Sequence, residues 1–116
     1  MNLANRAALT IIPKQPYAEW ANSVDDQEPK LSLESPHVEY TVYLIGNVAN
    51  DRGVAAALKE HYAEIFEEEL AVWMQDEKTW PKNRDYRMFR EWFEVKVSSM
   101  VLDLGNDRIE VEEFDS

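Results

Sequence analysis

Two short basic segments hold side chains that could together bind an anion. They are Pro-Lys-Gln-Pro at 13–16 and Trp-Pro-Lys-Asn-Arg at 80–84. Each lies just before a predicted helix start, where free N–H groups and the helix dipole favour anions. If the two segments meet in space, they could receive a carboxylate or a phosphate. The candidate binding residues are Lys14, Gln15, Trp80, Lys82, Asn83 and Arg84.

A packing explanation competes with this binding explanation. Residues 78–96 hold six of the twelve lysines and arginines, together with aromatic side chains at the spacing of a buried helix face. The aromatic residues could enter the core while the basic residues neutralise the acidic helix before them. Arg87 with Glu91 also has the i,i+4 spacing of a helical ion pair. We favour packing for the segment as a whole and assign the turn at 80–84 as the part available for function.

Glu69 is a candidate for acid–base chemistry. It lies four residues after Ile65 and four before Trp73, on the apolar stripe of a predicted long helix. A carboxylate at such a position is costly unless it is paired or protonated. We expect a structural ion pair with a lysine or arginine of the basic segments. A role as a general base is the alternative.

Metal and cofactor chemistry finds little support in the sequence. His61 and Glu64 are three residues apart, but the helical di-iron pattern runs Glu-x-x-His and needs a second copy. The chain has three glycines, no cysteine and no glycine-rich phosphate loop. We therefore predict no catalytic residue, no metal ligand and no cofactor.

Hydrophobic periodicity and capping signals predict the helices and strands around these residues. The expected elements are a strand at 6–12, a helix at 16–24, a strand at 39–45, a helix from Asn50 or Asp51 to Met74, a helix after Asp85, and a strand at 94–104. Residues 25–37 have no periodicity and predict an exposed, mobile loop.

Two strands invite more detailed expectations. Residues 39–45 are apolar or aromatic on both faces, which predicts a central position in the sheet. The strand at 94–104 changes phase at Ser98 and Ser99, which is typical of a β-bulge. Gly105 and Asn106 indicate a hairpin turn. Residues 107–116 would then form an edge strand, or an acidic tail.

The order of elements is β-α-β-α-α-β, with the last strand left open. It predicts an α+β fold in two layers: a mainly antiparallel sheet of three to four strands with helices mostly on one face. At 116 residues the chain is expected to be a single domain spanning 1–116. Its net charge of −11 opposes direct binding to nucleic acid. No membrane helix, secretory signal or cysteine is present, so we expect a cytoplasmic protein.

The chain resembles a family of small uncharacterised bacterial proteins. The resemblance covers most of the chain and rests on "TIIPKQPYAEWANS", "HYAEIFEEEL" and "WPKNRDYRMFREWF". No chemistry is assigned to that family, so the resemblance implies no active site. It implies a bacterial, cytoplasmic setting.

Three functions compete at this point. We favour a non-enzymatic binding or regulatory protein whose partner is another protein, and we leave a homo-oligomer open. The alternative is a small acid–base enzyme, or enzyme subunit, acting on an anionic substrate near Lys14, Glu69 and Lys82. A further alternative is an acidic mimic of nucleic acid, with carboxylates of the long helix and the C-terminal tail along one exposed ridge.

Overall fold

A three-stranded antiparallel sheet forms the centre of the chain in its computed structural model, which describes residues 1–26, 30–34 and 39–113. The sheet order is β3 (Thr41–Gly46), β2 (Arg6–Pro13) and β4 (Phe93–Ser98). Leu9 and Ile11 of β2 are fully buried on one face, as their alternation predicts.

The expectation that 39–45 is a central strand is wrong. β3 is an edge strand, and β2 is the strand paired on both sides. Tyr43 and Ile45 face the helices, whereas Val42 and Leu44 point to the other face and are more than half exposed. The apolar residues of this strand therefore occupy two different environments. One face of the strand is buried, and the other is apolar but exposed.

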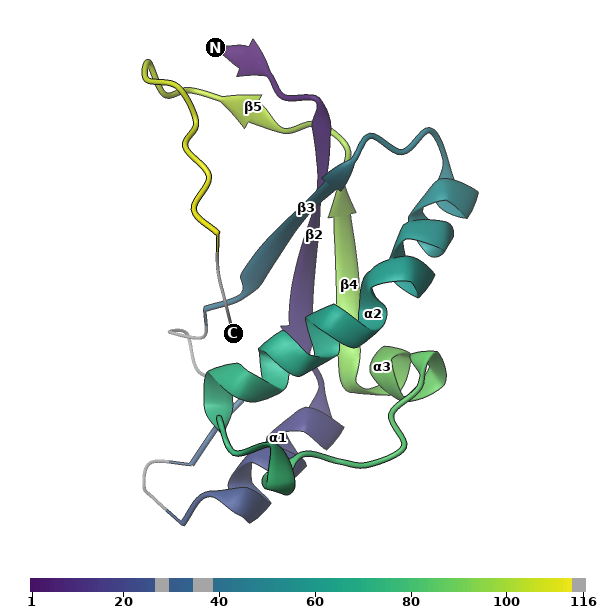
Figure 1. Cartoon of the computed structure of the whole chain (residues 1–116), viewed down its shortest axis with the longest axis vertical. Coiled ribbons are helices and arrows are strands. Elements are labelled where there is room, and N and C mark those ends of the chain that lie inside the picture. The colour runs from purple at the N-terminus through teal and green to yellow at the C-terminus, as the bar shows by residue number, and fades with distance from the viewer. Residues whose placement is uncertain (27–29, 35–38, 114–116) are drawn as a thin grey trace.

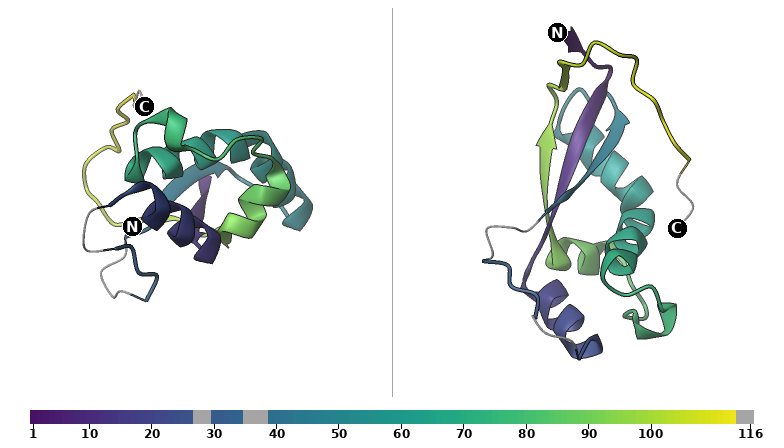
Figure 2. Two further views of the ribbon diagram at one scale, coloured as in Figure 1. Left: turned by 90° about the horizontal axis from the view of Figure 1, so that it is seen from below. Right: turned by 90° about the vertical axis from the view of Figure 1, so that its left-hand side faces the viewer.

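Three helices complete the α+β architecture, which confirms the expected fold class. Helix α2 (Asp51–Trp73) crosses one face of the sheet, as Figures 1 and 2 show. Helices α1 (Gln15–Val24) and α3 (Tyr86–Trp92) lie at the end where β2 finishes and β4 begins. A short 3₁₀ helix, η1 (Glu77–Thr79), follows α2. None of the helices within the described ranges combines the length and apolar character that crossing a bilayer requires.

Helix boundaries follow their capping residues. The side chain of Asn50 accepts a 3.0 Å hydrogen bond from the Gly53 amide at the start of α2. The side chain of Asp85 accepts a 2.8 Å bond from the Met88 amide at the start of α3. Both caps satisfy N–H groups that have no partner inside the helix, and both confirm the sequence prediction.

The aromatic residues of the basic segment pack in the core. Phe89 and Phe93 are fully buried against Phe66 of α2, with ring centroids 6.0 and 5.4 Å from it. Trp92 lies 6.2 Å from Trp20 of α1, centroid to centroid. The packing explanation is therefore confirmed for these aromatic side chains.

The C-terminal third departs from expectation. The strand beginning at Phe93 ends at Ser98 instead of continuing to 104 through a bulge. The chain then leaves the main sheet, and β5 (Leu102–Asp103) pairs with β1 (Asn2–Leu3) in a separate two-stranded ribbon. Residues 107–113 form no strand, so the expected edge strand is not present in the described part of the tail. The predicted hairpin would have paired this region with the residues that follow Asn106. In the structure, β5 pairs with the N-terminal strand β1 instead.

The segment predicted to be a mobile loop is described in part. Residues 27–29 and 35–38 of it lie outside the described ranges. In the remainder, the Asn22 side chain accepts a 2.8 Å bond from the Leu31 amide and donates a 3.1 Å bond to the Leu31 carbonyl. Leu31 is half-buried against the core. These contacts anchor this part of the segment to α1.

Candidate functional site

The turn at 80–84 is held mainly by Arg84. Its guanidinium donates to the Pro81 carbonyl at 2.7 Å and to the Glu67 carboxylate at 3.1 Å. It also lies over the rings of Trp80 and Phe66, 5.7 and 5.9 Å from their centroids. These contacts confirm the expected pairing of the basic segment with the acidic helix. Arg84 therefore has a structural role in this turn.

The other residues of this turn divide between packing and exposure. The indole N–H of Trp80 donates a 2.8 Å hydrogen bond to the carbonyl of Met74, the residue that caps the C-terminal end of α2. This bond holds Trp80 against the end of the helix. Asn83 has a φ of 58°, in the left-handed region that asparagine tolerates better than most residues. The side chains of Lys82 and Asn83 are exposed. Lys82 and Asn83 thus remain accessible to a ligand.

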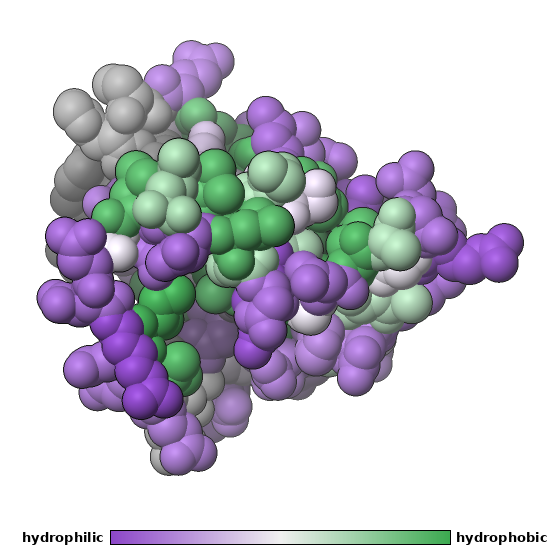
Figure 3. Space-filling view, turned by 90° about the horizontal axis from the view of Figure 1, so that it is seen from above, coloured by the Kyte–Doolittle hydropathy of each residue, from purple (hydrophilic) through white to green (hydrophobic). Residues whose placement is uncertain are grey.

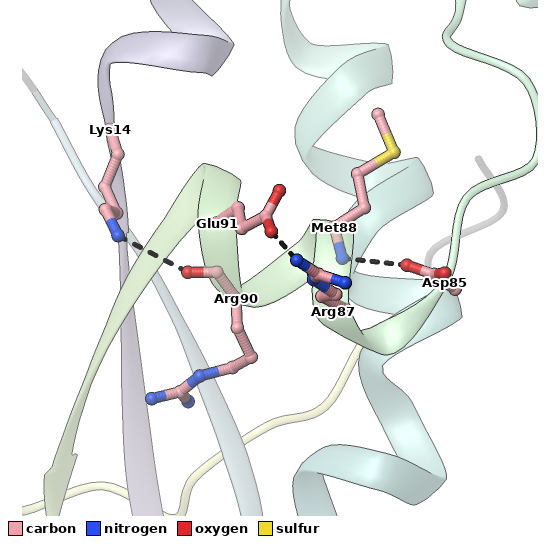
Figure 4. A network of polar contacts seen from close by, with 6 residues as sticks. All are labelled: Lys14, Asp85, Arg87, Met88, Arg90 and Glu91. Atoms are coloured by element: carbon pink, nitrogen blue, oxygen red, sulfur yellow. Dashed lines mark hydrogen bonds and ion pairs between the residues drawn. The ribbon is translucent and has the colours of Figure 1, made fainter.

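The other candidate segment makes different contacts. The Lys14 ammonium lies 3.4 Å from the Arg90 carbonyl, and Figure 4 shows it reaching toward the end of α3. The Lys14 amide donates to the Trp92 carbonyl at 2.8 Å. Gln15 is exposed at the first position of α1. In the described part of the chain, no hydrogen bond or ion pair joins Lys14 or Gln15 to the turn at 80–84. The anion site that combines the two segments stays a prediction.

Glu69 is buried, as its helix phase predicts, but the expected ion pair is wrong. Its carboxylate accepts a 2.7 Å hydrogen bond from the Tyr43 hydroxyl and a further one from Thr41. Within the described ranges, no lysine or arginine pairs with it. The pKa of Glu69 is raised, chiefly because burial disfavours the charged form, while the bonds from Tyr43 and Thr41 oppose that rise. The sequence prediction missed this arrangement because a strand supplies both hydroxyls.

A groove between α2 and β4 was not foreseen from the sequence. It consists of two adjoining cavities of about 350 Å³ each, which share Asp51, Val54 and Val97. We call this surface the α2–β4 groove. The first cavity extends toward Val48 and Ser99, and the second toward the residues Leu58, Tyr86, Arg90 and Val95. Alternating valines on β4 and apolar residues on α2 are the only sequence signals for it.

The groove runs along an open sheet edge. β4 pairs with β2 on one side, and among the described residues no strand pairs with its other side. Val95 and Val97 point into the groove, two residues apart, and contribute to the second cavity together. Arg90 lines that cavity, and its guanidinium points away from Lys14 (Figure 4). The groove therefore combines apolar walls, a charged residue of each sign and free backbone groups.

A second apolar surface covers one side of the β1–β5 ribbon. Leu3 and Leu102 are directly paired and exposed by 63% and 49%. Met1 and Leu104, each two residues along the chain from one of these leucines, are also exposed. Figure 3 shows apolar side chains gathered over this end of the molecule. We call these four residues the ribbon face.

Neither cavity of the groove is lined by Lys14, Glu69 or Lys82. No group of three or more histidine, cysteine, aspartate or glutamate residues is arranged to hold a metal ion within the described ranges. The chain matches no family model, no curated protein and no solved structure.

Proposed function

We propose that this chain is a non-enzymatic protein-binding domain that takes an extended segment of a partner protein into the α2–β4 groove. The observation that carries the proposal is the coincidence of an unpaired β4 edge with two adjoining, partly apolar cavities. A strand added to a sheet edge gains main-chain hydrogen bonds, while its alternate side chains enter pockets and provide specificity. A partner segment with two apolar residues at i and i+2 has the required spacing.

Binding is favoured over the acid–base enzyme for a geometric reason. Lys14, Glu69 and Lys82 line neither cavity, and the Glu69 carboxylate is occupied by hydroxyl groups of β3. An acidic mimic of nucleic acid is less favoured because residues 107–113 have no regular structure to hold their carboxylates at fixed spacing. A bacterial, cytoplasmic setting and a docking role for Lys14 and Lys82 stay predictions.

A selection of random seven-residue peptides displayed on phage tests the proposal. We expect the selected peptides to alternate apolar and polar residues and to bind the purified chain in solution. Val97→Asp places a charge in both cavities and should weaken this binding at least tenfold. Val42→Asp is the matched control, because Val42 lies on an edge strand of the same sheet but is 54% exposed on the opposite face.

Both variants must first show the circular dichroism and thermal midpoint of a folded chain. Selected peptides that bind equally well to the wild type and to Val97→Asp would contradict the proposed groove. Loss of binding in Val42→Asp with retention in Val97→Asp would move the site to the open face of the sheet.

A further inference from the structure

The C-terminal tail has the composition of a strand but no partner. In residues 107–113, Ile109 and Val111 alternate with charged residues, as in a half-buried strand. Both side chains are exposed, by 61% and 91% respectively. The tail therefore presents two apolar side chains at i and i+2, which is the spacing that the α2–β4 groove requires.

We propose that the groove of one copy of this chain is occupied by residues 107–113 of a second copy. This inference rests on the proposed function, because it names the partner of the same groove. The tail would add to the free edge of β4 as a further strand, with Ile109 and Val111 entering the two cavities. Reciprocal exchange of the two tails would give a closed, symmetric dimer.

Charge supports this pairing. If Ile109 and Val111 lie opposite Val95 and Val97 in either strand direction, the residue between them, Glu110, lies opposite Lys96. Opposite charges directly across a strand pair are stabilising. Lys96 is exposed on β4. β2 pairs with one edge of β4, and the tail would pair with the opposite edge.

The groove itself adds a second favourable charge. Arg90 lines the cavity nearest the start of β4. The tail has an acidic residue at each end. Asp107 in the parallel direction, or Glu113 in the antiparallel direction, would lie on the groove side near this guanidinium. Two like charges oppose this attraction: Asp51 lines both cavities, and in the antiparallel direction Glu112 would lie opposite Glu94 of β4.

The position of the tail favours a second copy over the same chain. In Figure 1 the tail descends on the side of the molecule where β3 forms the sheet edge. The groove lies at β4, the opposite edge of the sheet. The tail would have to cross the sheet to reach the groove of its own chain. A neighbouring molecule can present its tail to that edge directly.

The experiment uses two full-length variants. The tail variant carries Ile109→Asp and Val111→Asp, and the groove variant carries Val97→Asp. All three positions are at least 40% exposed, so both variants are expected to fold, which circular dichroism and the thermal midpoint check. Sedimentation velocity over a hundredfold concentration range measures association. We expect the wild type to dimerise and each variant alone to remain a monomer.

An equimolar mixture of the two variants is the decisive sample. The tail variant has an intact groove and the groove variant has an intact tail, so one productive contact remains and heterodimers should form. A fluorescent peptide of residues 107–113 should also bind the tail variant and not the groove variant. Lys96→Glu should weaken dimerisation several-fold, and combining it with Glu110→Lys should restore it.

Four results would overturn the inference. A monomeric wild type whose tail variant binds the peptide would mean that the tail occupies the groove of its own chain. A monomeric wild type whose tail variant does not bind the peptide would exclude the tail as the occupant. A dimer that survives in the tail variant but is lost with Leu102→Glu would assign association to the ribbon face. A groove that binds phage-selected peptides but not residues 107–113 would leave the proposed function standing and exclude the tail as its ligand.

Discussion

The hydroxyl of Tyr43 on β3 donates a 2.7 Å hydrogen bond to the carboxylate of Glu69 on α2. The bond joins an edge strand to the long helix that crosses the sheet. It also supplies a buried acid with a neutral partner where an ion pair was expected. A second tyrosine, Tyr17 of α1, donates to the backbone carbonyl of Glu69 at 2.6 Å. One helical position is thus linked to two separate elements.

This arrangement predicts a pH-dependent contribution of Glu69 to stability. Its folded pKa lies above its ordinary value of 4.5, so protonation favours the folded chain. The contribution is fully present below pH 4.5 and is lost as the pH rises through the folded pKa. Glu69→Gln keeps a carbonyl acceptor for Tyr43 without the charge. Its stability relative to wild type should therefore increase as the pH rises above 4.5.

Urea unfolding of both chains across this pH range measures the difference. Glu64→Gln is the control, because Glu64 is exposed on the same helix. Parallel pH profiles for wild type and Glu69→Gln would show that the Glu69 carboxyl titrates as it does in the unfolded chain.

Arg84 should contribute more to stability than its neighbour Lys82. Arg84→Ala removes two hydrogen bonds and two cation–π contacts, and we expect the free energy of unfolding to fall by about 1–2 kcal/mol. Lys82→Ala should stay within about 0.5 kcal/mol of wild type, because the lysine is exposed. Thermal unfolding compares the two. If Arg84→Ala and Lys82→Ala both had small effects on the free energy of unfolding, Arg84 would have no structural role and would be available to bind a ligand.

The backbone of Asn83 offers a direct test of the turn at 80–84. Its φ of 58° lies in the left-handed region, where a residue with a Cβ is less stable by roughly 1–2 kcal/mol. Glycine does not have this cost, and for asparagine the cost is smaller. Asn83→Ala should lower the free energy of unfolding by about 1 kcal/mol. Asn83→Gly should be close to neutral. A stable alanine variant would indicate that the turn adopts another conformation in solution.

The double hydrogen bond between Asn22 and Leu31 should protect the adjoining segment from proteases. In wild type, limited proteolysis is expected to cut first within residues 25–37, and Asn22→Ala should make that cut several-fold faster. Glu19→Ala is the control, since Glu19 is exposed on the same helix. Mass spectrometry of the early fragments locates the cut. First cleavage inside α2 in either chain would contradict the assignment.

Local chemistry made much of the fold predictable. Asn50 and Asp85 cap the helices that follow them because a side-chain oxygen bonds to an N–H two or three residues away. Alternation along β2 put Leu9 and Ile11 on one face, which is the buried one in the structure. The spacing of Glu69 along its helix identified its burial. The pairing of Arg87 with Glu91 likewise needs only one turn of helix.

The candidate site was less predictable. The sequence placed Trp80 and Arg84 in one turn, and in the structure the Arg84 guanidinium lies over the Trp80 ring. It gave no account of the α2–β4 groove, whose walls come from segments some forty residues apart. Glu69 was assigned the wrong partner for the same reason, since Tyr43 is 26 residues away along the chain.

Local patterns in the chain were enough to predict where the helices begin, which stripe of α2 is buried, and that the aromatic residues of the basic segment pack inside. Tertiary structure alone decided that β2 is the central strand, that β5 pairs with β1, and that β4 keeps a free edge beside a groove. The physical reason is the range of the interactions. Capping and side-chain periodicity act over a few residues, whereas strand pairing and cavity walls depend on which distant segments exclude water together.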